Sequence, residues 1–178
     1  GKYRFGYGKE QAESKIEALG IEQDENGNNY PTHKHTITKL GYEVLEKAVY
    51  NGEIYNYKEL KKELSEYDFQ TNSDSEVIIA AYQKWGEKCL SRLNGMFSFV
   101  IYDKQNKSLF VARDRYGVKP FYYHFDGETF YFASEIKAIH AAGIEKKPNE
   151  RIWANYFCYG SYGMPNESFW EDISQLAG

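Results

Sequence analysis

The spacing of the apolar residues changes near residue 95, and this change constrains the fold more than any other feature. Between residues 77 and 85 the apolar side chains recur with a period of about 3.6, which predicts a helix that ends near Gly86. From residue 97 the period falls to 2, which predicts β-strands. The chain therefore contains both kinds of element in separate segments.

Four strands follow from the period of 2, and polar loops join them in pairs. We expect these strands at residues 97–102, 108–112, 121–125 and 129–133. The loops at 103–107 and 126–128 are polar, so the strands form two antiparallel hairpins. Further helices are predicted at 135–142 and 150–159. Helices that bracket antiparallel hairpins indicate a layered α+β domain.

The stretch from residue 47 to 56 is predicted to be a strand that leads into a sharp turn. Residues 47–50 are β-prone, and Asn51-Gly52 is the dipeptide that best tolerates a positive φ. The Asn side-chain amide and the Gly backbone N–H can converge on one oxygen, as in an oxyanion hole. The alternative is an ordinary hairpin turn.

Two helices are expected to begin soon after this turn. Asn56 is a candidate cap for a helix at 58–64. Ser73 and Glu76 have the spacing of a capping box, in which the serine bonds a helix amide and the glutamate reaches back.

The first 47 residues have a weaker pattern. Helix formers fill residues 9–19, and Gly20 would end such a helix. Residues 22–36 are rich in turn-forming residues and are predicted to be an exposed loop. Residues 40–45 fit a short strand or a turn of helix equally well.

Two features of this segment resemble ligand sites without meeting their requirements. Residues 6–9 read Gly-Tyr-Gly-Lys, but the spacing of a phosphate loop is absent and no Ser or Thr follows the lysine. His33 and His35 have no cluster of carboxylates or cysteines in register, so we interpret them as part of a solvated loop and predict no metal site.

Composition narrows the class of protein. With 178 residues, of which 42% are hydrophobic, the chain suits one globular domain. A net charge of −4 gives no indication that the chain binds nucleic acid or an anionic membrane. Two cysteines, Cys89 and Cys158, make a disulfide framework unexpected and favour a reducing cytoplasm. No apolar run is long enough to span a bilayer, and no signal-peptide core is present, so we expect a cytoplasmic protein.

Four motifs occur in order along the rest of the chain. They are NGEIYNYKEL from residue 51, FQTNSDSEV from 69, LFVARDRYGVKPFYY from 109 and FASEIKAI from 132. Over residues 48–178 the chain resembles the glutaminase domain of glutamine-hydrolysing asparagine synthetases, which are class II glutamine amidotransferases of the N-terminal-nucleophile hydrolase superfamily. The resemblance implies a four-layer αββα sandwich for residues 48–178, and leaves residues 1–47 as an atypical N-terminal segment.

The resemblance also implies roles for single residues. Asn51 and Gly52 match the pair that forms the oxyanion hole, while Glu53 and Asp74 match the two acids that hold the α-amino group of glutamine. Asp74 has a structural alternative, because an acid is favoured in the first turn of any helix. The stretch 113–120 matches a segment that frames the pocket or meets a partner domain, and its alternative is a salt-bridged surface turn.

The chain departs from the family at the nucleophile. The family uses an N-terminal cysteine, whereas this chain begins Gly1-Lys2-Tyr3 and has no Cys, Ser or Thr before Ser14. Cys89 and Cys158 are not expected to replace it. The family's upstream motif, whose arginine grips the glutamine carboxylate, is not recognisable. We therefore expect this chain to be inactive as it stands.

The resemblance implies hydrolysis of glutamine to glutamate and ammonia, with ammonia passed to an acceptor that is aspartate in the family. The partners it implies are glutamine and a synthetase domain or partner chain, which alone would use ATP and Mg²⁺; we expect no cofactor in this chain. The alternative is a non-catalytic pseudo-glutaminase that binds a ligand or another protein. An altered enzyme and a nucleophile arranged in another way also remain open.

Overall fold

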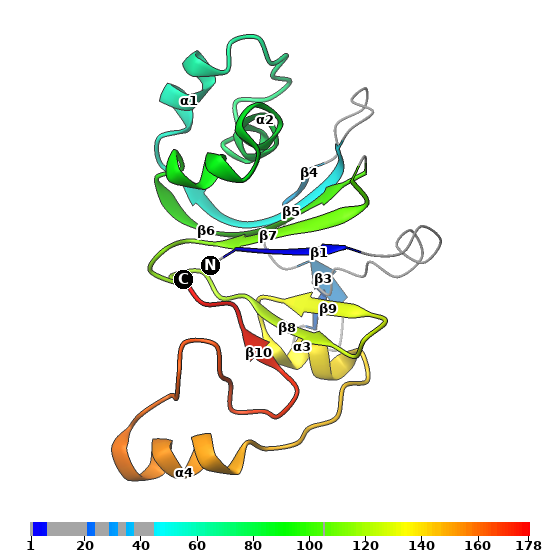
Figure 1. The fold of residues 1–178 in the computed structure, drawn as a ribbon, viewed down its shortest axis with the longest axis vertical. Helices are drawn as coiled ribbons and strands as arrows, with labels where there is room; N and C mark the ends of the chain where they lie inside the picture. The colour runs from blue at the N-terminus through cyan, green and yellow to red at the C-terminus, as the bar shows by residue number, and fades with distance from the viewer. Residues whose placement is uncertain (1, 7–20, 24–28, 32–34, 38–44, 105) are drawn as a thin grey trace.

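The chain forms two antiparallel sheets that face one another (Figure 1). The computed structural model describes residues 2–6, 21–23, 29–31, 35–37, 45–104 and 106–178. The larger sheet has five strands in the order β1, β7, β6, β5, β4, and all neighbouring strands are antiparallel. Their bounds are β1 Lys2–Gly6, β4 His35–Ile37, β5 Leu45–Ile54, β6 Gly95–Asp103 and β7 Ser108–Arg113.

Helices cover one face of the larger sheet. These are α1 (Tyr57–Glu63), α2 (Ser75–Trp85) and the 3₁₀ helix η1 (Gly86–Ser91). Residues 75–82 of α2 are all buried, because this helix lies between α1 and the sheet. The helix-side core joins apolar residues of α1, α2 and η1 to alternate residues of β5 and β6. Its largest fully buried members are Tyr50, Ile54, Leu60, Leu64, Ile78, Phe99, Ile101 and Phe110.

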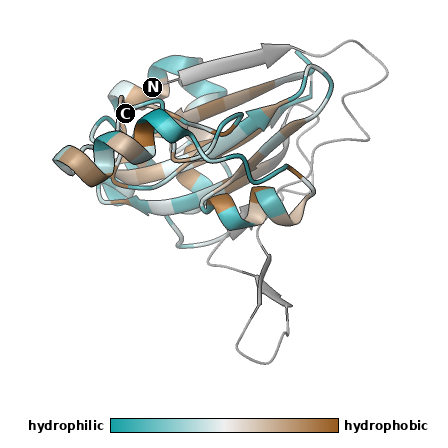
Figure 2. Ribbon diagram, turned by 90° about the horizontal axis from the view of Figure 1, so that it is seen from below, coloured by the Kyte–Doolittle hydropathy of each residue, from teal (hydrophilic) through white to brown (hydrophobic). Residues whose placement is uncertain are grey.

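The smaller sheet covers the other face. It consists of β10 (Ser174–Gln175), β8 (Tyr122–Phe125) and β9 (Phe130–Ala133), in that order. The inter-sheet core contains Val100, Leu109 and Val111 from the larger sheet, Phe130 and Phe132 from the smaller one, and Phe121 directly before β8. Helix α3 (Ile136–Ala141) packs behind the smaller sheet through Ile139. Hydrophobic residues accordingly recur along the strands in Figure 2.

Two further elements lie outside these layers. The strands β2 (Ile21–Gln23) and β3 (Asn29–Pro31) form a separate two-stranded ladder. Helix α4 (Glu150–Tyr159) lies at the far end of the molecule, below the smaller sheet in Figure 1.

The predicted hairpins and the helices that follow them are confirmed. β6–β7 and β8–β9 are antiparallel hairpins, and α3 and α4 lie at the positions that the pattern predicted. The α+β class is therefore confirmed, in a mixed structure with antiparallel sheets. The predicted loop at 22–36 is wrong in part, because β2, β3 and β4 fall within it. The predicted helix at 9–19 and the undecided segment at 40–44 lie outside the described residues.

Two local predictions about helix starts are corrected. Asn56 occupies the N-cap position of α1, but its side chain bonds the backbone of Arg92 and Asn94 at 2.9 Å each instead of a helix amide. Helix α2 has Asp74 as its N-cap, and the Glu76 carboxylate accepts from the amides of residues 70 and 71. Asn56 thus connects α1 to a segment that is distant in sequence, and Glu76 holds the residues that precede its own helix.

Candidate functional site

Asn51 and Gly52 lie inside a strand, so the predicted turn at this dipeptide is wrong. Strand β5 continues to Ile54, and the turn follows at residues 55 and 56. Asn51 is opposite Ser98 of β6, and Gly52 is opposite Phe97.

Gly52 is required here by the close approach of β6. Its φ of +153° is a conformation that side-chain-bearing residues rarely adopt, and a Cβ would overlap the carbonyl oxygen of Met96 and lie 2.7 Å from Cα of Phe97. The positive φ that the Asn-Gly pair predicted is therefore present, although the chain does not reverse there.

The side chain of Asn51 points toward the smaller sheet. Its Nδ2 donates to Oγ of Ser134, which follows β9, at 3.1 Å. A small pocket between the two sheets is lined by Asn51, Ser98, Phe132 and Ser134, among others. One N–H of the amide is held by the serine, and the other has no partner among the described residues.

The backbone N–H of Gly52 points away from β6. Phe97 directs both its backbone groups to Asp114, because its N–H donates to Oδ2 at 3.2 Å and its C=O accepts from the Asp114 N–H at 2.7 Å. In an antiparallel ladder the N–H and C=O of one residue point to the same neighbouring strand. Gly52, opposite Phe97, therefore does not use its N–H in the pairing with β6.

Asp74 lies against β5 on the helix side of the sheet. It is the N-cap residue of α2, and its Oδ2 accepts from the hydroxyl of Tyr50 at 2.7 Å and from the N–H of Ile54 at 2.8 Å. Its Oδ1 has a longer contact of 3.4 Å with the hydroxyl of Ser73. The carboxylate is therefore attached to β5 through Oδ2, while Oδ1 has only the long contact with Ser73 among the described contacts.

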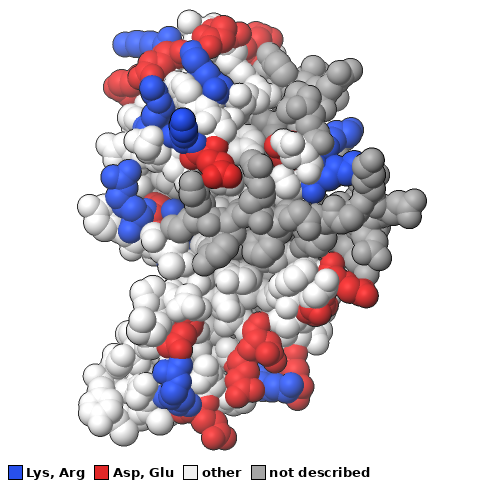
Figure 3. Space-filling view, viewed as in Figure 1, with Lys and Arg blue, Asp and Glu red and all other residues white. Residues whose placement is uncertain are grey.

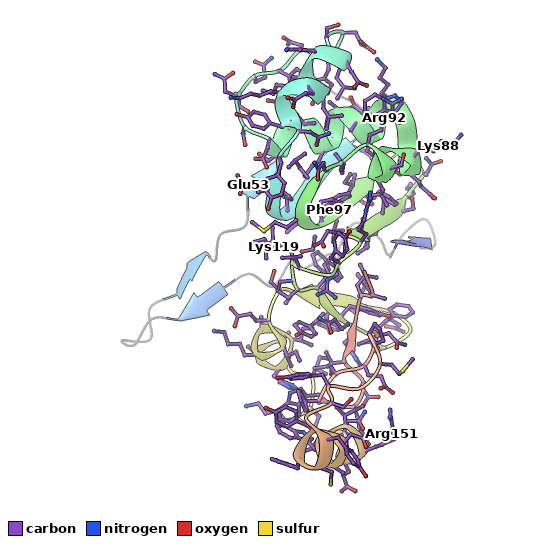
Figure 4. The ribbon with its side chains drawn as sticks, turned by 90° about the vertical axis from the view of Figure 1, so that its left-hand side faces the viewer. Glu53, Lys88, Arg92, Phe97, Lys119 and Arg151 are labelled. Carbon is purple, nitrogen blue, oxygen red and sulfur yellow. The ribbon has the colours of Figure 1, made fainter. Side chains whose placement is uncertain are left out.

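Glu53 brings a second negative charge to the same end of β5. Burial raises the pKa of the Tyr50 hydroxyl well above its ordinary value, and the hydrogen bond to Asp74 and the charges of Asp74 and Glu53 raise it further. Tyr50 is thus a neutral donor at all physiological pH values. Glu53 is exposed, and Figure 4 shows it at the side of the upper half of the molecule, whereas Arg151 of α4 lies near the bottom.

The four predicted residues lie in or beside the second half of β5, but Asn51 and Asp74 are on opposite faces of the larger sheet. Asn51 faces the smaller sheet, while Asp74 lies on the helix side, where Tyr50 is part of the core. Two further residues, Tyr50 and Ser134, were missed by the sequence analysis. Tyr50 directly precedes the motif at residue 51, and Ser134 lies within the motif that begins at 132. No local pattern indicates that their hydroxyls bond Asp74 and Asn51.

Arg113 at the end of β7 and the following Asp114 are buried, so the interpretation as a salt-bridged surface turn is wrong for these two residues. Their exposed fractions are 8% and 2%. The guanidinium of Arg113 donates to the carbonyls of Gly117, of Lys119 at 2.5 Å and of Leu176 at 2.6 Å. Arg113 therefore joins the loop to the segment after β10.

Asp114 holds the same loop through backbone amides. Its carboxylate accepts from the N–H groups of Phe97, Tyr116, Val118 and Lys119 at 3.0–3.2 Å. Burial of the carboxyl acts to raise its pKa, but these hydrogen bonds outweigh burial, and the pKa lies below the ordinary value.

The two cysteines are separate from this site. Cys89 is fully buried in the helix-side core, and burial raises its pKa to about 12, so it is a neutral thiol at pH 7. Cys158 is exposed on α4. Within the described part of the chain, no three His, Cys, Asp or Glu side chains are grouped as a metal ion requires, and no helix there has the length and apolar character to cross a membrane.

The two facing antiparallel sheets and the helices that cover them are similar to those of a known amidotransferase. A solved structure of a glutamine phosphoribosylpyrophosphate amidotransferase from B. subtilis matches 61% of this chain and 26% of its own, with a TM-score of 0.51 and 27% identity. The family of glutamine amidotransferase domains matches residues 40–178, and the chain belongs to this family.

Curated relatives specify the kind of glutamine amidotransferase domain. Asparagine synthetase [glutamine-hydrolyzing] 3 of Bacillus subtilis is 40% identical over 131 residues, which are 72% of this chain and 21% of that protein. A putative asparagine synthetase of Methanocaldococcus jannaschii is 51% identical over 102 residues, or 57% of this chain and 20% of that protein. The domain is of the asparagine synthetase type, and the chain spans about a fifth of the length of these relatives.

Proposed function

We propose that this chain binds glutamine as the glutaminase-type domain of an asparagine-synthetase-like protein. The observation that carries the proposal is the attachment of Asp74 to β5 beside Asn51, Gly52 and Glu53. Two carboxylates and two amide-type donors at the end of one strand suit the ammonium and the amide of an α-amino acid amide.

In this proposal the Asn51 side-chain amide and the Gly52 N–H stabilise the oxyanion that forms when the amide carbon of glutamine becomes tetrahedral. The direction of the Gly52 N–H away from β6 supports this role. Loss of one such donor typically lowers kcat by about 10²–10³. Asp74 and Glu53 hold the α-ammonium, and the single long contact of the Asp74 Oδ1 among the described residues supports that assignment.

We further propose that the layers correspond to the four-layer αββα sandwich of the N-terminal-nucleophile hydrolases. Helices α1 and α2 on one face, two sheets, and α3 behind the second sheet support it. Residues 48–178 would form this domain.

Hydrolysis needs a nucleophile, and neither cysteine suits the role. The thiol of Cys89 is buried and protonated, and Cys158 belongs to the distant helix α4. We therefore propose that the 178-residue chain alone binds glutamine and does not hydrolyse it. In a complete enzyme, the released ammonia would pass to an acceptor such as aspartate in a synthetase domain that uses ATP and Mg²⁺.

The proposed partners are glutamine and such a domain, in the cytoplasm. Nucleic acid is not among them. The net charge of −4 and the interspersed acidic and basic side chains on the face in Figure 3 support this.

The test is to measure glutamine binding by calorimetry and ammonia release in parallel. We expect binding without release. We expect Asp74→Asn to weaken binding at least about 10-fold, because the variant loses one of the two negative charges that face the ammonium. Asp126→Asn, in the exposed β8–β9 turn, is the control and should bind as the wild type does.

Each outcome separates the alternatives. Ammonia release above the protein-free rate would disprove the inactive form and indicate a true glutaminase. Binding without release supports the non-catalytic alternative for this chain. Absence of glutamine binding, with a folded protein, would refute the proposed site.

A further inference from the structure

The hydroxyl of Tyr50 is a buried polar group for which the proposed chemistry has no direct use. Tyr50 is 1% exposed, and its ring is part of the helix-side core. Its hydroxyl donates to Oδ2 of Asp74 at 2.7 Å, across 24 residues of sequence. A phenylalanine would fill the same core volume, so packing alone does not require the oxygen atom.

The hydrogen bonds at Asp74 are divided unequally between its two oxygens. Oδ2 accepts from both Tyr50 and the N–H of Ile54, whereas Oδ1 has only the longer contact with Ser73 among the described contacts. Two donors on one oxygen set the rotation of the carboxylate about its Cβ–Cγ bond. Oδ1 is thereby held in a defined direction.

The protonation state of Tyr50 keeps this arrangement constant. Burial raises the pKa of the hydroxyl, and the adjacent carboxylates Asp74 and Glu53 raise it further. The hydroxyl is therefore protonated at pH 7, where it donates to Asp74 and does not compete with it as an anion.

We propose that Tyr50 is a positioning residue, which holds Oδ2 of Asp74 so that Oδ1 is presented to the α-ammonium of the bound amino acid. This inference rests on the proposed function, because it needs an ammonium ligand at Asp74. In Tyr50→Phe the N–H of Ile54 alone holds Oδ2, so the carboxylate gains rotational freedom and recognises the ammonium less well.

The experiment compares two ligands that differ only in the group that Asp74 would contact. L-Glutamine carries the α-ammonium, and glutaramic acid is the same molecule without it. We would measure both dissociation constants by calorimetry for the wild-type chain and for Tyr50→Phe. We expect the wild type to prefer glutamine and the variant to lose about 5- to 20-fold of that preference, with little change for glutaramic acid.

Tyr82→Phe is the matched control. Tyr82 is also a buried tyrosine on the helix side, and its hydroxyl contacts a carboxylate, Oδ2 of Asp103, at 3.4 Å. Asp103 ends β6, away from residues 50–54 of β5. The control should keep the full preference for glutamine, even if its thermal stability falls as much as that of Tyr50→Phe.

The two ligands also separate this inference from the proposed function. If the wild type shows no preference for glutamine over glutaramic acid, the amine site itself is refuted and the role of Tyr50 falls with it. If the wild type prefers glutamine and Tyr50→Phe retains that preference in full, the role of Tyr50 alone is refuted. Equal losses in Tyr50→Phe and Tyr82→Phe would also refute it, because they would indicate a general effect on stability.

Discussion

At the scale of single residues, the candidate site depends on which atoms the neighbours leave available. One N–H of Asn51 donates to Ser134, and one oxygen of Asp74 accepts from Tyr50 and Ile54. In each case a hydroxyl bonds one polar atom of the side chain. The second N–H of Asn51 and Oδ1 of Asp74 are the atoms that we propose for the ligand. Gly52 contributes through its missing side chain, which lets β6 approach the strand closely.

Replacement of Gly52 by alanine is expected to destabilise the fold by about 2–4 kcal/mol, because strain at a positive φ is added to overlap with the backbone of β6. Chemical denaturation monitored by tryptophan fluorescence measures this loss. Gly143→Ala is the matched control, since Gly143 has a φ of +103° and open space around its Cβ position. The control should lose only about 1 kcal/mol. Equal losses in the two variants would contradict the role of the close approach.

At the scale of elements, the loop after β7 connects both sheets. Arg113 and Asp114 bond backbone groups of the loop, of β6 and of the segment after β10. The charges of Arg113 and Asp114 are therefore held inside the protein, where hydrogen bonds to the backbone replace those to water. This explains why a charged motif can be buried without an ion pair as its main contact.

Asp114→Asn is expected to lower the free energy of unfolding by about 2–4 kcal/mol at pH 7, because hydrogen bonds from amides to a charged acceptor are weakened. The pKa of Asp114 is lowered from its ordinary value of 3.8, so the folded state favours the charged form. This stabilisation is complete above the unfolded pKa and is lost as the pH falls through the folded pKa.

The difference in stability between wild type and Asp114→Asn should therefore be constant from about pH 7 to 5 and shrink below about pH 4. Urea denaturation across this pH range measures it. A difference that grows on acidification would show that the carboxylate is not stabilised by these amides.

At the scale of the whole molecule, the core is unevenly distributed. All but the first two residues of β6 and all of β7 are buried, with cores on both faces of the sheet. Helix α4 buries only Ile152. Its Trp153 and Phe157 stack on each other, and Trp153 and Tyr156 contact Phe169 with tilted and edge-on rings. Phe157 and Tyr159 are 76% and 83% exposed.

Hydrogen exchange should follow this difference. We expect the amides of β6 and β7 to exchange only through global unfolding, and those of α4 to exchange at least about 100-fold faster through local opening, because few buried contacts hold the helix. Exchange followed by mass spectrometry on peptides from 95–113 and 150–159 measures both rates. Equal protection of the two segments would contradict the prediction that α4 opens locally while the core stays folded.

The periodicity of the chain determined the two hairpins, α3 and α4, because these elements are stabilised by contacts between residues that are close in sequence. The order of the motifs also indicated the family and four residues around β5. Caps were less predictable. Asn56 and Glu76 carry the right chemistry for local caps, but their partners are residues 92, 94, 70 and 71.

The sequence by itself thus determined the class of the fold, most of its elements and four of the candidate site residues. Only the tertiary structure decided that Asn51-Gly52 continues a strand, since pairing with β6 outweighs the local tendency of this dipeptide to turn. It also decided that Tyr50 orients Asp74 and that Ser134 orients Asn51. These contacts join residues 24 and 83 positions apart, and no local pattern records a hydrogen bond between residues that only folding brings together.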